Sequence, residues 1–84
     1  MASIALTLYT RPDCHLCADM TAVVLPLAHD FGCTFDQIDI TGDAGLEARF
    51  GMEIPVLCIN GRKAFKYRVA AGELRRQLQR EQRR

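Results

Sequence analysis

The sequence contains no apolar run that approaches the roughly 18 residues of a membrane-spanning helix. Its first ten residues have neither the basic start nor the cleavage site of a secretory signal peptide. No repeat, linker or low-complexity segment divides the chain, and its 84 residues suffice for one small domain, 1–84. These absences predict a cytoplasmic protein with no membrane partner.

Positive and negative charges nearly balance, with a formal net charge of +1, but they are unevenly distributed along the chain. Residues 1–61 hold two basic and eight acidic residues, whereas residues 62–84 hold nine basic and two acidic residues. A basic segment can indicate nucleic-acid binding. No aromatic residue lies among the arginines of residues 68–84, however, so a platform for stacking bases is missing. We therefore expect these arginines to cover the solvent face of a C-terminal helix, and we predict no nucleic-acid partner.

Two of the four cysteines form a C-x-x-C motif, Cys14-His15-Leu16-Cys17. The motif follows a strand predicted from Ile4 to Thr10, and it opens a predicted helix. At a helix N-terminus the first sulfur faces unpaired backbone N–H groups and the positive end of the helix dipole. Both lower the pKa of a thiol from about 8.5 by one unit or more. In a chain with no predicted export signal, this motif indicates a dithiol redox site rather than a structural disulfide.

The hydrophobic pattern predicts six further elements after the first strand. They are a helix over Cys14–Phe31, a strand over Cys33–Ile40, a helix over Ala44–Phe50, strands over Ile54–Ile59 and Lys63–Tyr67, and a helix over Ala71–Gln82. Pro26 is expected to kink the first helix or divide it near Ala22. Asp43 fits the N-cap of the second helix, and Asn60-Gly61 is a strong hairpin signal. The order is β-α-β-α-β-β-α, with the first two strands parallel and the last two antiparallel.

Two segments of the chain resemble those of a known family. The string Leu8-Tyr9-Thr10-Arg11-Pro12-Asp13-Cys14-His15-Leu16-Cys17 is similar to the Y-T-[KR]-x-x-C-x-x-C opening of glutaredoxins. Ile54-Pro55-Val56 is similar to the segment that carries their cis-proline. The chain thus resembles the small bacterial glutaredoxin-like proteins of the thioredoxin superfamily. The resemblance implies an α/β thioredoxin-like fold, with a four-stranded mixed sheet and helices on both faces.

The resemblance also implies roles for individual residues. Cys14 matches the nucleophilic cysteine of the family and Cys17 the resolving one. Pro55 matches the cis-proline, and Ile54 matches the residue whose backbone pairs with a bound peptide or glutathione. Arg11 matches the basic residue that supports the thiolate or binds a glutathione carboxylate.

The chain departs from the glutaredoxin pattern at two places. His15 stands where many dithiol glutaredoxins have proline, and its positive charge when protonated would stabilise the Cys14 thiolate. We therefore expect a potential more oxidising than the roughly −270 mV of thioredoxin. Residues 68–73 read Arg-Val-Ala-Ala-Gly-Glu in place of the Gly-Gly-x-Asp segment that holds glutathione. Residues 68–73 therefore do not predict that this chain binds glutathione in the way that is usual for glutaredoxins.

The sequence as a whole predicts a thiol–disulfide oxidoreductase that reduces protein disulfides or glutathione mixed disulfides. The resemblance implies no tightly bound cofactor, glutathione as a co-substrate, and glutathione or a thioredoxin-type reductase as the reducing partner of a monomer. One alternative is a non-catalytic module that holds a metal or an iron–sulfur cluster between two chains, with Cys14 as a ligand. Zinc in one chain is disfavoured because Cys33 and Cys58 do not form a second C-x-x-C. Another alternative is an adaptor that binds partners through the basic helix.

Overall fold

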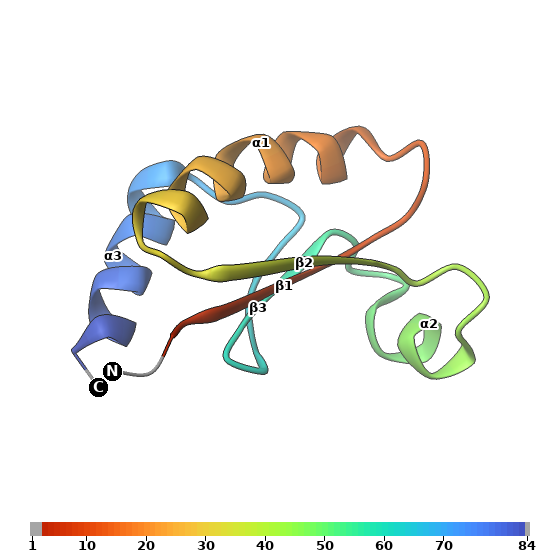
Figure 1. Ribbon diagram of the computed structural model, residues 1–84. Helices are drawn as coiled ribbons and strands as arrows, with labels where there is room; N and C mark the ends of the chain where they lie inside the picture. The colour runs from red at the N-terminus through yellow and green to blue at the C-terminus, as the bar shows by residue number, and fades with distance from the viewer. Residues whose placement is uncertain (1–2, 84) are drawn as a thin grey trace.

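The computed structural model describes residues 3–83 and contains the seven predicted elements in the predicted order (Figure 1). They are β1 (Ala5–Thr10), α1 (His15–Asp30), β2 (Thr34–Asp39), α2 (Ala44–Phe50), β3 (Val56–Ile59), β4 (Arg62–Lys66) and α3 (Ala71–Gln82). The strands form one sheet in the order β2-β1-β3-β4. β1 is parallel to β2 and antiparallel to β3, and β3 and β4 form an antiparallel hairpin.

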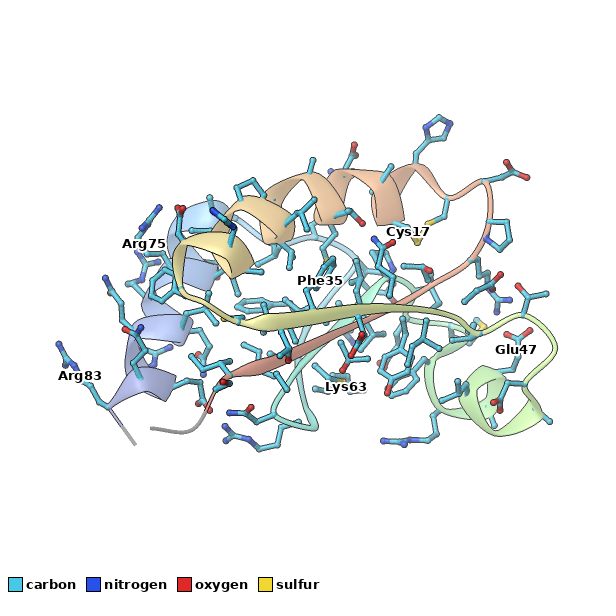
Figure 2. All side chains as sticks on the ribbon, viewed as in Figure 1. Cys17, Phe35, Glu47, Lys63, Arg75 and Arg83 are labelled. Atoms are coloured by element: carbon cyan, nitrogen blue, oxygen red, sulfur yellow. A yellow bond between two sulfur atoms is a disulfide. The ribbon has the colours of Figure 1, made fainter. Side chains whose placement is uncertain are left out.

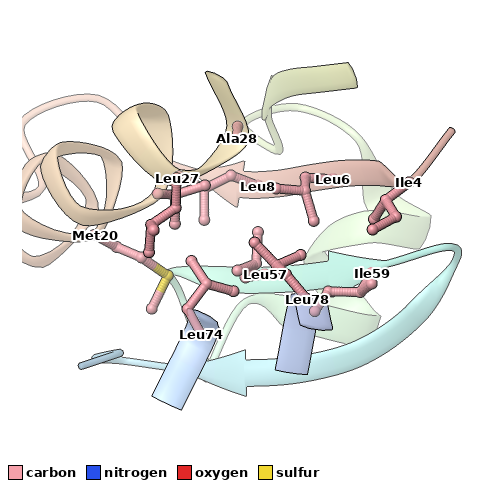
Figure 3. Close-up of a cluster of buried hydrophobic side chains, with 11 residues drawn as sticks. Ile4, Leu6, Leu8, Met20, Leu27, Ala28, Leu57, Ile59, Leu74 and Leu78 are labelled. Carbon is pink, nitrogen blue, oxygen red and sulfur yellow. The ribbon is translucent and has the colours of Figure 1, made fainter. Parts of the chain in front are cut away.

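Helices cover both faces of the sheet. Alternate side chains of the central strands point to opposite sides, and apolar side chains on both sides are buried beneath helices. Leu57 and Ile59 of β3 belong to a cluster that also contains α1 and α3 residues, including Leu74 and Leu78 (Figure 3). The other face holds a smaller cluster in which Val56 and Cys58 pack with Phe50 of α2 and with Tyr9. The predicted two-sided architecture is confirmed.

α1 is a single helix from His15 to Asp30 with Pro26 inside it. Of the two effects expected of Pro26, a kink or a division near Ala22, the division is therefore excluded. Proline removes the N–H that the Ala22 carbonyl would have bound. Ala22 and Pro26 both lie on the exposed side of α1, where water can hydrogen-bond that carbonyl while the opposite side remains packed. None of the helices within residues 3–83 has the length and apolar character to cross a membrane.

α3 packs Leu74 and Leu78 into the larger cluster, and both are fully buried. Its arginines are exposed, as the sequence predicts: Arg75, Arg76, Arg80 and Arg83. The buried Glu81 carboxylate accepts hydrogen bonds from Arg62 at 2.9 Å and from Asn60 at 3.0 Å. These bonds fasten the end of α3 to the β3–β4 turn, where Asn60 and Gly61 both have positive φ as the hairpin signal requires.

Candidate active site

Cys14 and Cys17 form a disulfide at the start of α1, near the label of Cys17 in Figure 2. Their Cα atoms are 5.2 Å apart. Cys14 is the N-cap of α1, and its Sγ accepts a hydrogen bond from the backbone N–H of Cys17 at 3.1 Å. Cys14 is half-buried, whereas Cys17 is only 5% exposed. The first sulfur therefore has an amide donor of the kind that stabilises a thiolate, and the second sulfur lies one turn deeper.

The Ile54–Pro55 peptide is cis, as the resemblance predicts. Val56 pairs with Tyr9 in the β1–β3 register, so the cis peptide lies at the end of the sheet where β1 ends and the chain continues to Cys14. Pro55 is buried, and Ile54 is half-buried against the smaller cluster. Within residues 3–83, the main chain of Ile54 forms no hydrogen bond with another backbone group. Its N–H and C=O are therefore free to pair with an extended chain.

Arg11 lies in the loop between β1 and Cys14, but its guanidinium is engaged by α2. Nη1 donates to Oε2 of Glu47 at 3.0 Å, Nη2 donates to Oε1 of the same carboxylate, and Nη2 also donates to the Gly51 carbonyl at 3.3 Å. The hydrogen bond with Glu47 raises the pKa of Arg11. The Thr41 backbone N–H, with a smaller contribution from the Arg11 charge, lowers the pKa of Asp39.

The chain is similar to a known protein family and to solved structures. Residues 5–79 match the model of the Glutaredoxin-like domain (DUF836). The chain belongs to this glutaredoxin-like family. The uncharacterized protein Rv0508 of Mycobacterium tuberculosis is 31% identical over 78 residues, which cover 87% of this chain and 80% of that protein. The uncharacterized protein Mb0520 of Mycobacterium bovis matches to the same extent.

Solved structures also resemble this glutaredoxin-like domain. The target protein XcR50 from X. campestris has 38% sequence identity and a TM-score of 0.70, with 89% of this chain and 96% of that chain covered. Thioredoxin 1 from Thermosipho africanus has 14% identity and a TM-score of 0.71, with 94% of each chain covered. That second likeness shows the thioredoxin fold, and the cysteine pair at the start of α1 is typical of redox proteins with this fold.

The remaining cysteines of this glutaredoxin-like domain lie outside the start of α1, where Cys14 and Cys17 meet. Cys58 is buried in β3, as expected of a small apolar residue, and Cys33 is half-buried just before β2. Burial raises the pKa of both thiols. Both are therefore protonated at neutral pH, which makes them poor nucleophiles. No group of three or more His, Cys, Asp or Glu side chains able to hold a metal is found between residues 3 and 83.

The structure brings the predicted site residues to one region, although their roles stay predictions. His15 is exposed in the first turn of α1, beside Cys14. Sequence reasoning missed Glu47 as the partner of Arg11, because the two residues are 36 positions apart and no local pattern connects them. It also missed Tyr67, whose φ of 68° is unusual for an aromatic residue and whose N–H donates to the Pro55 carbonyl at 2.9 Å.

Proposed function

We propose that the protein is a thiol–disulfide oxidoreductase that reduces protein disulfides or glutathione mixed disulfides through Cys14 and Cys17. The observation that carries the proposal is the position of Cys14 at the N-cap of α1, with its sulfur bonded to the Cys17 N–H and joined to the Cys17 sulfur. A sulfur in this position is stabilised as a thiolate after reduction, and a thiolate is the form that attacks disulfides.

The reaction proceeds in two exchanges. The Cys14 thiolate attacks one sulfur of the substrate disulfide, forms a mixed disulfide, and releases the other substrate sulfur as a thiolate that takes up a proton. The Cys17 thiol gives up its proton and its sulfur attacks Cys14, which forms the Cys14–Cys17 disulfide and releases the second substrate thiol. The substrate gains the two electrons that the protein loses. A reducing partner, glutathione or a thioredoxin-type reductase, returns them.

The residues around the dithiol have distinct proposed roles. The free main chain of Ile54, which precedes the cis peptide to Pro55 at the end of the sheet, pairs with the extended segment that contains the substrate disulfide. His15, when protonated, adds a positive charge beside the Cys14 thiolate. Arg11 lies three residues before Cys14 and supports the loop that presents it. We propose that the protein acts in the cytoplasm as a monomer without a tightly bound cofactor.

A trapping experiment tests the proposal. The Cys17→Ser variant is expected to accumulate mixed disulfides through Cys14 in cell extract, because the second exchange is blocked. Cys14→Ser is expected to accumulate none. A Cys17→Ser/Cys33→Ser variant serves as the matched control, since Cys33 lies outside the site and its removal should leave the trap intact. Equal adduct levels in Cys14→Ser and Cys17→Ser would contradict the proposal, as would a brown, visible-absorbing dimer in which Cys14 binds a cluster.

A further inference from the structure

The cation that the chain places three residues before Cys14 is paired with a carboxylate. Both oxygens of Glu47 accept hydrogen bonds from the Arg11 guanidinium, a two-pronged geometry that is stronger than a single contact. The pair is accessible, with 37% of the Arg11 side chain and 35% of the Glu47 side chain exposed. Two of the three hydrogen bonds that Arg11 donates go to the Glu47 carboxylate. Because the two charges cancel, the ion pair presents no net charge to a substrate at the dithiol.

The other charges in this region have both signs, and Glu47 hydrogen-bonds none of them. Asp39, at the end of β2, also feels the Arg11 charge, and Asp13 is exposed next to Cys14. Arg68 is exposed beyond β4, on the segment adjoining Pro55, and contributes equally whether or not Glu47 is charged. Glu47 lies at the same end of the molecule as Cys17, whereas Arg75 and Arg83 lie at the opposite end (Figure 2). The charge of Arg11 is thus the one that Glu47 controls near the dithiol.

We propose that Glu47 is a specificity-determining residue, because its ion pair with Arg11 disfavours anionic disulfides such as glutathione disulfide relative to neutral or cationic ones. The inference rests on the proposed disulfide exchange and goes beyond it by naming the charge class of the substrate. Replacing Glu47 with glutamine keeps a side chain that can hydrogen-bond Arg11 but removes the negative charge. Arg11 then attracts carboxylates, and the selectivity shifts toward anions.

The test measures single-turnover exchange of the pre-reduced protein with three small disulfides that differ in charge. Glutathione disulfide is anionic, bis(2-hydroxyethyl) disulfide is neutral, and cystamine is cationic. Each turnover oxidises the dithiol by two electrons and converts the disulfide into two thiols, so no further reductant is needed. Acid quenching, alkylation and mass spectrometry count the thiols that remain. Dividing each rate constant by that of the neutral disulfide removes any change in the reactivity of Cys14 itself.

In Glu47→Gln the normalised rate with glutathione disulfide is expected to rise about three- to fivefold, which is the size of one exposed charge pair. The normalised rate with cystamine is expected to fall, and both changes should shrink in 0.5 M salt because salt screens exposed charges. Arg11→Gln leaves Glu47 unpaired and is expected to move the same ratios in the opposite direction. This second variant carries the test if Glu47→Gln fails to fold, as judged by circular dichroism.

Asp30→Asn is the matched control, because it removes one exposed negative charge at the far end of α1, about 24 Å along the helix from Cys14. The normalised rates of this variant with glutathione disulfide and with cystamine should equal those of the wild type. Unchanged ratios in Glu47→Gln, or an equal shift in Asp30→Asn, would overturn the role of Glu47 and leave the proposed exchange standing. If the wild type does not react even with the neutral disulfide, the proposed function fails and this inference fails with it.

Discussion

Gly45 and Gly51 lie within and just after α2, and alanine at each position is expected to change stability in opposite directions. A Cβ built on Gly45 meets only the Asp43 carboxylate oxygen at 3.5 Å, which is ordinary van der Waals contact. A Cβ on Gly51 meets the backbone carbonyl oxygen of Glu47 at 2.5 Å and the Arg11 guanidinium at 3.1 Å. The backbone oxygen cannot move aside as a flexible side chain would, since it accepts the Gly51 N–H at 2.9 Å.

These contacts set the expected magnitudes. Alanine in place of an exposed helical glycine stabilises by about 0.5–1 kcal/mol, so Gly45→Ala should raise the free energy of unfolding by about that amount. At Gly51 a similar unfolded-state gain is outweighed by overpacking, which costs about 1–3 kcal/mol. Displacement of Arg11 from the Gly51 carbonyl adds to that cost. We expect Gly51→Ala to lower the free energy of unfolding by about 1–2 kcal/mol.

Thermal unfolding of the two variants, followed by circular dichroism at one pH and one redox state, provides the measurement. In a domain of this size 1 kcal/mol corresponds to a change in Tm of about 4–8 °C. Gly51→Ala should therefore melt about 6–24 °C below Gly45→Ala. Equal melting temperatures, or a stabilised Gly51→Ala, would show that the chain does not approach Gly51 as closely as the structure indicates.

Three further predictions concern the thiols and the two ion pairs of Glu53. In the reduced protein, Cys33 and Cys58 should be alkylated far more slowly than Cys14 at pH 7, because burial raises the pKa of both thiols; mass-resolved alkylation checks this. Hydrogen bonds from Lys63 and then Lys66 lower the pKa of Glu53, so its stabilisation is present above its unfolded pKa and is lost as the pH falls. Glu53→Gln should therefore lower the urea midpoint at pH 7, and this difference from the wild type should shrink as the pH falls through the acid range. The dithiol should have a potential above about −270 mV in a redox titration, and a clearly lower value would refute the proposed influence of the histidine within the motif.

Local patterns in the sequence predict most of the fold because their causes are local. Asp43 caps α2 by accepting the Leu46 N–H at 3.0 Å, and Asn60-Gly61 has the positive φ values that its hairpin requires. The two cysteines meet because one helical turn separates them. The cis peptide before Pro55 followed from the family resemblance rather than from any local pattern.

Features that depend on contacts between distant segments of the chain cannot be predicted from local sequence patterns. The pairing of β1 with β3, as in the register of Tyr9 with Val56, joins strands that two helices and another strand separate in the chain. The position of Pro26 inside an unbroken α1 depends on which side of the helix faces solvent. The Arg11–Glu47 pair depends on how α2 packs beside the loop before Cys14. Each of these three features can be predicted only when it is known which segments of the chain pack together.

The charge asymmetry of the sequence becomes a spatial asymmetry in the folded chain. Arg75 of α3 and Arg83, which directly follows α3, lie at one end of the molecule, while Cys17 and Glu47 lie at the other (Figure 2). An adaptor that bound partners through the basic helix would use a surface that the dithiol does not share. Loss of disulfide exchange in Cys14→Ser would thus leave that surface unchanged, because α3 is held by its own buried leucines and by the bonds of Glu81. Binding that survives Cys14→Ser would therefore belong to α3, whereas binding that disappears with the sulfur would belong to the exchange site.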